Sequence, residues 1–199
     1  MNEEAPPHSP QWWDARYRQG NTPWDRGVVA PEIERFAREY PGHGAWALDI
    51  GCGTGVHSRE LCRHGYRVIG IDLAHTALER ALAAARAEEL PWWGVQASAD
   101  DIPVRGRFFT VAIDIGCFHA LSEAQQHAYA TGLARILLPG AAFLLYAVRP
   151  RRLQDVSGPP GVAPEQIRDV LKPAFREEWR QQGWQGERRA DWWLWKRRS

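Results

Sequence analysis

Residues Ala45–Gly55 read AWALDIGCGTG, an apolar run that ends in an acid and passes into three glycines separated by small residues. A helical pattern begins directly afterwards, at Val56. A buried strand that enters a glycine turn and then a helix brings backbone N–H groups to the end of a sheet. The glycines let the backbone pass close to a ligand, because no Cβ stands in the way. The segment therefore predicts a nucleotide-type cofactor site, and an ordinary tight turn is the alternative.

The spacing of these glycines distinguishes between cofactor classes. The dinucleotide fingerprint G-x-G-x-x-G requires a glycine where this chain has Val56, which disfavours an NAD-linked dehydrogenase. The observed pattern, D-x-G-x-G-x-G, resembles the first motif of the class I S-adenosylmethionine-dependent methyltransferases. The resemblance implies that Asp49 lies near the amino group of the cofactor. It also implies that the turn lines the cofactor through Gly51, Cys52, Gly53 and Gly55.

Hydrophobic periodicity predicts strands and helices that alternate along the chain. Strands are predicted at 45–50, 67–72, 91–97, 108–113, 142–148, 175–179 and 191–197, and helices at 11–19, 32–40, 56–64, 74–89, 122–138 and 164–171. The resemblance implies an α/β fold with a single Rossmann-like, doubly wound, seven-stranded sheet. This sheet is mostly parallel with an antiparallel last strand, and helices cover both faces. One methyltransferase domain is expected over residues 11–199, after a disordered or loosely attached N-terminus at residues 1–10.

A second specific pattern, W-x-x-x-Y-x-x-G-x-T-P-W-D-x-G-x-x-x-P, runs from Trp13 to Pro31. It resembles the N-terminal segment of the thiopurine and halide/thiol methyltransferases. The resemblance implies that residues 11–40 form a helical lid, with Trp13 and Trp24 against the cofactor. Tyr17 stands where a second tryptophan often occurs and is expected at the substrate pocket. A plain packing arm is the alternative.

Acids follow the next strands at the same predicted edge. A carboxylate at Asp72, followed by Leu73, can accept hydrogen bonds from both ribose hydroxyls, and the alternative of a helix cap is compatible with that role. Ser98, Ala99 and Asp100 are expected beside the adenine. Ser98 stands where the family often places an acid, so either Asp100 substitutes or the contact is lost.

The predicted reaction centre follows the fourth strand. The family's fourth motif implies that Asp114 lies near the methyl donor. His119 is a candidate base or a residue that shapes the pocket, because its ordinary pKa is near neutral. Cys117 and Phe118 are expected in the substrate pocket, with core packing as the alternative for Cys117. Ile115 replaces an arginine that often follows the acid in thiopurine methyltransferases, which indicates a less anionic acceptor.

The segment 149–161 contains Arg149, Arg152 and a Gly-Pro-Pro sequence. It resembles a loop over the acceptor pocket in the halide/thiol group. The resemblance therefore implies that both arginines contact the acceptor, whereas the alternative is a solvated connector.

Composition limits the partners of the chain. Lys and Arg number 25 against 24 Asp and Glu, which argues against a nucleic acid partner. No apolar run approaches the ~20 residues of a membrane span, and residues 1–10 lack the apolar core of a secretory signal. Three cysteines without a C-x-x-C pair favour a reduced, cytoplasmic compartment and no metal site.

These observations predict methyl transfer from S-adenosylmethionine to a small-molecule nucleophile by a monomer or homodimer. A thiol, thiopurine-like or halide acceptor is favoured. An amine, an oxygen nucleophile or a metalloid is an alternative acceptor. A non-catalytic module that binds S-adenosylmethionine is an alternative of another class.

Overall fold

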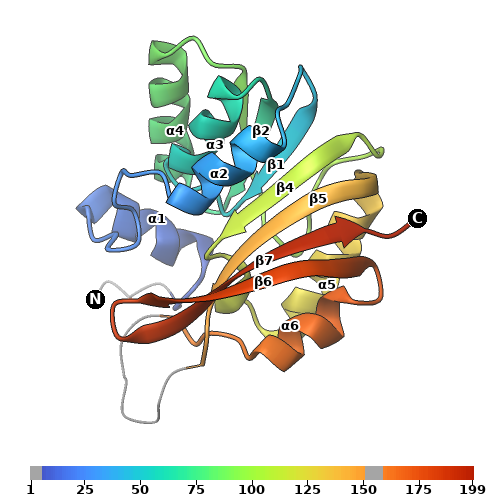
Figure 1. Ribbon diagram of the computed structural model, residues 1–199. Coiled ribbons are helices and arrows are strands. Elements are labelled where there is room, and N and C mark those ends of the chain that lie inside the picture. The colour runs from blue at the N-terminus through green and yellow to red at the C-terminus, as the bar shows by residue number, and fades with distance from the viewer. Residues whose placement is uncertain (1–5, 151–158) are drawn as a thin grey trace. The chain divides into compact units, whose positions relative to one another are not determined.

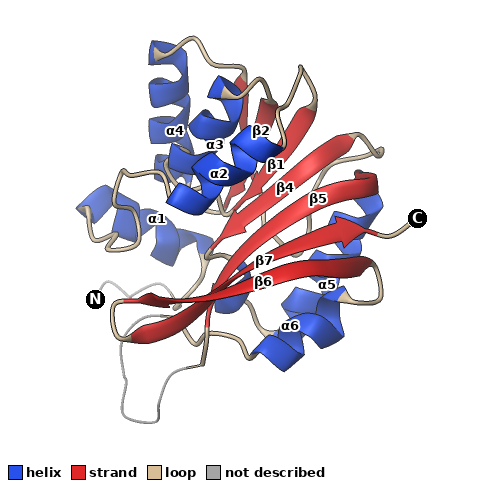
Figure 2. Ribbon diagram, viewed as in Figure 1, coloured by secondary structure: helices blue, strands red, loops and turns tan. Residues whose placement is uncertain are grey.

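The computed structural model describes residues 6–150 and 159–199 (Figure 1). Its strands form a seven-stranded sheet in the order β3-β2-β1-β4-β5-β7-β6, flanked by helices (Figure 2). The last strand, β7, is antiparallel to both of its neighbours, β5 and β6. The predicted α/β fold with an antiparallel last strand is therefore confirmed. The chain divides into two compact units, which meet in sequence at Ser98 and Ala99 and are described separately.

The first unit has parallel pairing of β1 with β2 and of β2 with β3. Its elements are α1 (Pro10–Gln19), α2 (Pro31–Glu39), β1 (Trp46–Ile50), α3 (Val56–Arg63), β2 (Arg67–Asp72), α4 (His75–Ala87) and β3 (Trp92–Gln96). Helix α1 begins at a proline because Ser9 caps it, and the Ser9 hydroxyl accepts the N–H of Trp12 at 3.2 Å. The chain is thus ordered into a helix from Pro10, whereas residues 1–5 lie outside the described part.

The second unit has a parallel pair, β4 and β5, followed by the antiparallel strands. Its elements are β4 (Phe109–Ile115), the 3₁₀ turn η1 (Phe118–Ala120), α5 (Glu123–Ile136), β5 (Leu137–Val148), α6 (Pro164–Leu171), β6 (Phe175–Gln185) and β7 (Arg188–Arg197). Ser122 and Gln125 form a capping box that fixes the start of α5. Trp193 and Trp195 of β7 are fully buried and stack at 5.6 Å between ring centroids.

Strands β5 and β6 are longer than the sequence predicts by five residues or more. Strand β5 already begins at Leu137, because Phe109 pairs with Leu137 before the register shifts to Val111 and Ala142. Pro139 and Gly140, which lie between the predicted helix and the predicted strand, therefore form an irregularity within β5. Strand β6 continues to Gln185 instead of ending at residue 179, and it is an edge strand whose outer half is mostly solvent-exposed. An exposed edge gives no apolar alternation, so periodicity could not reveal it.

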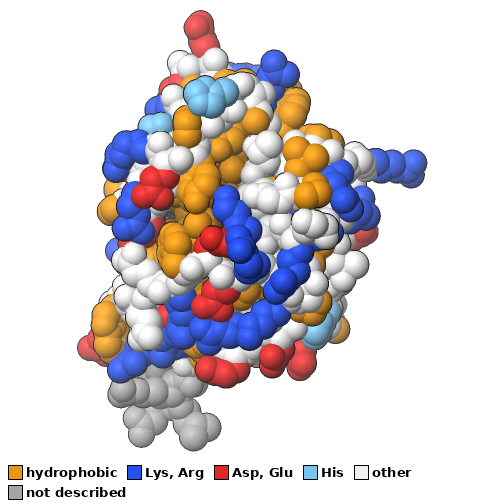
Figure 3. All heavy atoms as spheres, turned by 45° about the vertical axis from the view of Figure 1, so that its right-hand side comes forward, with side chains coloured by type: hydrophobic (Ala, Val, Ile, Leu, Met, Phe, Trp, Pro, Cys, Tyr) orange, Lys and Arg blue, Asp and Glu red, His pale blue; other side chains and the backbone are white. Residues whose placement is uncertain are grey.

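The surface carries both signs of charge. On the face shown in Figure 3, basic and acidic side chains lie interspersed with apolar ones, in keeping with the formal net charge of +1. Among the residues that the structure describes, no helix is long and apolar enough to cross a membrane.

Candidate functional site

The glycine turn after β1 adopts a backbone conformation that favours glycine. Gly51, Gly53 and Gly55 have φ values of +67°, +53° and +70°, which L side chains rarely adopt. The N–H groups of Gly51 and Cys52 both donate to the carbonyl oxygen of Ile71, at 2.8 and 3.0 Å. The start of the turn is thus held against the end of β2.

Asp72, at the end of β2, completes this turn. Its Oδ2 accepts the N–H of Gly53 and its Oδ1 accepts the N–H of Ala74, each at 2.8 Å. Burial raises the pKa of this carboxyl group, while the backbone N–H groups act in the opposite direction. Helix α4 takes Ala74 as its N-cap without a side-chain cap, so Asp72 supports the turn before the helix. The carboxylate lies beside the glycine turn, where its predicted contact with a ribose would be made.

Asp49 and Cys52 lie within the interior of the first unit. Asp49 is only 2% exposed, and one of its carboxylate oxygens accepts the hydroxyl of Ser58 on α3. The sulfur of Cys52 is so close to β2 that a Cβ added to Gly70 would lie 2.8 Å from it. Cys52 is therefore placed to line a ligand with its backbone, whereas its side chain packs inward.

The aromatic residues of the N-terminal segment lie against the glycine turn. Tyr17 is buried with Ala74, Ala77 and Trp13, and its hydroxyl accepts the indole N–H of Trp24 at 3.1 Å. A Cβ added to Gly53 would lie 2.8 Å from this hydroxyl oxygen. The rings of Trp13 and Trp24 meet edge to face, with centroids 5.4 Å apart. The segment thus brings the predicted aromatic residues to the turn, with Tyr17 in the cluster interior.

Two acids of the same segment hold it further, and neither is among the site residues predicted from the sequence. Oδ2 of Asp25 accepts the hydroxyl of Thr54 at 2.8 Å, and Oδ1 of Asp14 accepts the N–H of Thr76 at 2.7 Å. The only available signal was the acid of the T-P-W-D motif, because no spacing rule links either acid to its distant partner.

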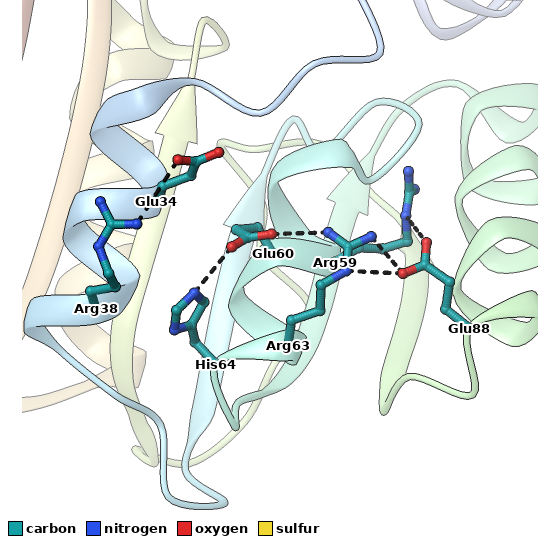
Figure 4. Close-up of polar contacts among 7 residues, drawn as sticks. All are labelled: Glu34, Arg38, Arg59, Glu60, Arg63, His64 and Glu88. Carbon is teal, nitrogen blue, oxygen red and sulfur yellow. Dashed lines mark hydrogen bonds and ion pairs between the residues drawn. The ribbon is translucent and has the colours of Figure 1, made fainter.

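A group of ion pairs supports the far side of the turn. Figure 4 shows Arg59 and Arg63 of α3 paired with Glu88, and Glu60 paired with Arg63. The distances to Glu88 are 3.1 Å from Arg59 and 2.5 Å from Arg63. Arg59 also donates to the carbonyl oxygen of Thr54 at 2.9 Å. The end of α4 is thereby connected to the turn through one guanidinium.

The residues predicted beside the adenine follow β3. Ala99 is buried, while Ser98 and Asp100 are partly exposed. The carbonyl oxygen of Leu73 accepts the side-chain amide of Gln96 at 3.0 Å. The contact of Ser98, Ala99 and Asp100 with an adenine ring stays a prediction.

In the second unit, Asp114 organises the loop after β4. The fully buried carboxylate accepts the N–H groups of Gly116, Cys117 and Phe118 at 3.1, 2.8 and 3.0 Å, and the hydroxyl of Tyr129 at 3.0 Å. Burial raises its pKa to about 7. Since both oxygens serve the loop, this geometry favours a positioning role over the predicted contact with the methyl donor.

His119 lies in η1 and is 5% exposed. Its Nδ1 accepts the N–H of Val148 at 3.3 Å, and its carbonyl oxygen accepts the N–H of Gly161 at 3.1 Å. Burial, with the charge of Arg188 as a smaller cause, lowers the pKa of His119 to about 3. The ring is therefore neutral, and we assign its proton to Nε2. This state suits a residue that shapes the pocket and donates a hydrogen bond, whereas the predicted alternative of a base is disfavoured.

The neighbours of His119 separate into core and partly exposed residues. Phe118 is fully buried and meets Tyr129 edge to face at 5.2 Å, which favours a packing role for the side chain, and its place in the substrate pocket stays a prediction. Cys117 is partly exposed.

Arg149 has a different partner from the predicted acceptor. It forms a two-pronged ion pair with Asp191 at 2.7 and 3.0 Å, and Arg180 reaches the same carboxylate at 3.0 Å. Asp191 is 1% exposed, so Arg149 compensates a buried charge, and the substrate role predicted for it is not supported. Arg152, predicted with it, lies outside the described residues.

Arg188 holds the described end of the segment 149–161, a role that no sequence motif predicts. Its guanidinium donates to the carbonyl oxygens of Arg149, Pro159 and Pro160, each at 2.8 Å. Gly161 has φ +81°, and a Cβ there would collide with this guanidinium and with the carbonyl of Arg149. Within residues 6–150 and 159–199, no group of three or more His, Cys, Asp or Glu side chains is arranged to hold a metal ion.

Comparison with known proteins places this site in context. A family model described as a methyltransferase domain matches residues 47–140. A 2-heptyl-1-hydroxyquinolin-4(1H)-one methyltransferase of Mycobacteroides abscessus is 29% identical over 75% of this chain and 66% of its own length. An uncharacterised methyltransferase of Schizosaccharomyces pombe is 32% identical over 50% of this chain and 69% of its own. Thiocyanate methyltransferase 1 of Brassica oleracea is 25% identical over 81% of this chain and 71% of its own length.

Many solved structures are similar to this chain, including two that cover almost all of it. One concerns the conversion of a disulfide bond into a thioacetal group during echinomycin biosynthesis; it has a TM-score of 0.80 and 25% identity, and covers 94% of this chain and 92% of the other. The second is 1,6-didemethyltoxoflavin-N1-methyltransferase of Burkholderia thailandensis with 1,6-didemethyltoxoflavin and S-adenosylhomocysteine bound. It has a TM-score of 0.75 and 17% identity, and the match covers 99% of this chain and 94% of the other.

Proposed function

Because the chain belongs to the class I S-adenosylmethionine-dependent methyltransferases, we propose that its methyl acceptor is a small-molecule thiol. S-adenosylmethionine is its methyl donor and supplies a methyl group activated by a sulfonium charge. The donor side follows from the family, whereas the acceptor is inferred from the loop after β4 and from the relatives.

The first unit offers a cradle that fits this donor. Gly53 has no Cβ, and any Cβ there would meet the hydroxyl of Tyr17, so the bare backbone of the turn is required. Asp72 would accept hydrogen bonds from the ribose, because its carboxylate lies directly beside the turn. Trp13 and Trp24 would exclude water and present aromatic faces, which attract cations such as a sulfonium.

The observation that carries the acceptor proposal is the hydrogen bond from Val148 to Nδ1 of His119. It occupies the lone pair that a base would use, and burial keeps the pKa of the ring near 3. Asp114, in the same loop, is saturated with donors. A thiol, whose ordinary pKa is ~8.5, needs no strong base near neutral pH. The chain then has to orient the thiolate in line with the methyl group.

The relatives support a sulfur acceptor in two independent ways. One relative is named for thiocyanate, a sulfur anion. The structure with 25% identity and a TM-score of 0.80 concerns chemistry at a disulfide. An acidic hydroxyl group is the second candidate, because another relative acts on a 1-hydroxyquinolinone. Such a hydroxyl also ionises without a strong base.

A product assay tests this proposal. The purified protein is incubated with S-adenosylmethionine and one acceptor at a time: thiophenol, 2-mercaptoethanol, thiocyanate, iodide, a 1-hydroxyquinolinone or a primary amine. We expect the highest kcat/KM for thiols, with a rate that rises with pH towards the pKa of each thiol. Turnover of the hydroxyquinolinone or the amine, with none for any thiol, contradicts the proposal. Donor binding without turnover of any acceptor favours the non-catalytic module.

A further inference from the structure

Arg16 of α1 is a cation enclosed by aromatic rings. Its guanidinium carbon lies 4.5 Å from the ring centroid of Trp12 and 5.5 Å from that of Trp24. Its Nε is buried and has no hydrogen-bond partner, and no acid within residues 6–150 and 159–199 forms an ion pair with it. Two other arginines of the first unit are paired with acids: Arg18 with Asp14, and Arg59 with Glu88.

A buried donor without a partner destabilises the fold, and a ligand that accepts its hydrogen bond would remove that cost. Aromatic contacts on the faces of a guanidinium leave its N–H groups directed outward in the plane of the group. Two parallel N–H donors on a rigid plane match the two oxygens of a carboxylate. The chemistry of the site therefore selects a planar anion.

The place of Arg16 indicates where such an anion would come from. Trp24, one of its two rings, donates a hydrogen bond to Tyr17, and the Tyr17 hydroxyl lies over Gly53. A short chain of contacts thus connects the cation to the turn assigned to the donor. S-adenosylmethionine carries one carboxylate, on its amino-acid part.

We propose that Arg16 binds a ligand carboxylate, with the amino-acid carboxylate of S-adenosylmethionine as the first source. An acceptor that carries its own carboxylate offers the same chemistry and is the second source. The inference rests on the donor that the family uses. Its test with donor analogues is independent of whether the acceptor is a thiol, whereas its test with acceptors rests on the proposed function.

Calorimetric titration separates these cases. S-adenosylhomocysteine and its decarboxylated analogue are titrated into the native protein and into Arg16→Gln. Arg26→Gln is the matched control, because Arg26 is exposed in the same segment. We expect Arg16→Gln to weaken S-adenosylhomocysteine about 10- to 100-fold and the decarboxylated analogue less than about 3-fold, since a charge-assisted contact is lost only with the carboxylate. Arg26→Gln is expected to change neither affinity, and Arg16→Lys to restore part of the loss.

The acceptor arm compares mercaptoacetate with 2-mercaptoethanol. A KM increase confined to mercaptoacetate in Arg16→Gln, with donor affinity unchanged, assigns the carboxylate to the acceptor. If Arg16→Gln weakens the binding of S-adenosylhomocysteine and of its decarboxylated analogue equally, the proposal is overturned, because Arg16 then only supports the packing of the tryptophans. The absence of any carboxylate dependence in either arm also overturns it. Removing the carboxylate from the ligand tests the native protein as well, so the proposal remains testable even if the variant does not fold.

Discussion

The N–H of Val148 donates to Nδ1 of His119 over 3.3 Å. This backbone bond fixes the orientation of the imidazole, and it leaves Nε2 as the nitrogen that carries the proton. His119 can therefore donate a hydrogen bond from Nε2 or shape the pocket by packing.

Replacing His119 by glutamine separates this role from that of a base. Glutamine retains an acceptor for Val148 and an N–H donor. We expect kcat/KM for thiols to fall less than about 5-fold and its pH profile to keep its shape, whereas loss of a general base costs about 10²–10⁴-fold. Initial rates between pH 6 and pH 9 provide the measurement. A fall in kcat/KM of more than 100-fold, together with a shift of the pH profile, would show that His119 acts as a general base.

Acid sensitivity is a second consequence of the buried histidines. Burial lowers the pKa of His119 to about 3 and that of His57 to about 4, below the ordinary value near 6.5. The unfolded chain then binds protons that the folded chain does not, so the contribution of these two histidines to stability is full above pH 6.5 and is lost as pH falls towards 4. The raised pKa of Asp114, about 7, acts in the opposite direction over this range, so the comparison of variants isolates the effect of the histidines. Each group contributes a slope of up to about 1.4 kcal/mol per pH unit. Urea unfolding from pH 7 to pH 4 should show a shallower loss for His119→Gln, but not for His127→Gln, which changes an exposed histidine.

Gly53→Ala tests the contact between the glycine turn and the N-terminal segment. The added Cβ meets the hydroxyl of Tyr17 and also carries the strain of a positive φ, which is ~1–2 kcal/mol. Gly20→Ala is the matched control, because Gly20 has φ +70° but nothing within 4 Å. We expect a larger loss of stability and of donor affinity for Gly53→Ala, partly recovered in the double variant with Tyr17→Phe. Additive effects of the two substitutions would show that the residues are not in contact.

Asp72→Asn retains the shape of the side chain but removes its charge. The N–H of Gly53 loses a charge-assisted acceptor, so we expect affinity for S-adenosylhomocysteine to fall about 10- to 100-fold. Calorimetry measures this change, and Asp101→Asn, at an exposed position, controls for net charge. Unchanged affinity would remove Asp72 from the donor site.

The contacts of Arg188 predict effects on the acceptor alone. Arg188→Gln and Gly161→Ala both release the Pro159-Pro160 carbonyls from the guanidinium. We expect a higher KM for the acceptor and faster protease cleavage within 149–161, with donor affinity within about 2-fold of the native value. Gly186→Ala serves as control, since Gly186 has φ +59° and no atom within 4 Å. Equal acceptor KM values in all four proteins would show that this segment does not reach the acceptor.

The sequence predicts features that are local in the chain and misses those that depend on distant partners. The glycine turn and Asp72 follow from a motif in which strand, acid and glycines lie close together. The motif also predicted that Arg149 contacts a substrate. Its ion-pair partner, Asp191, lies 42 positions further along the chain, so no local pattern reveals the pair. Position in a motif does not state which way a side chain points, and this is why Phe118, next to a partly exposed cysteine, was not recognised as core.

The hydroxyl of Tyr17 lies where only a glycine leaves room, so the two residues constrain each other's evolution. A relative with a larger residue at position 53 could not accept this N-terminal segment unchanged. Chimeras that exchange the first forty residues between family members should therefore fold well only when the turn at 51–55 is exchanged with them.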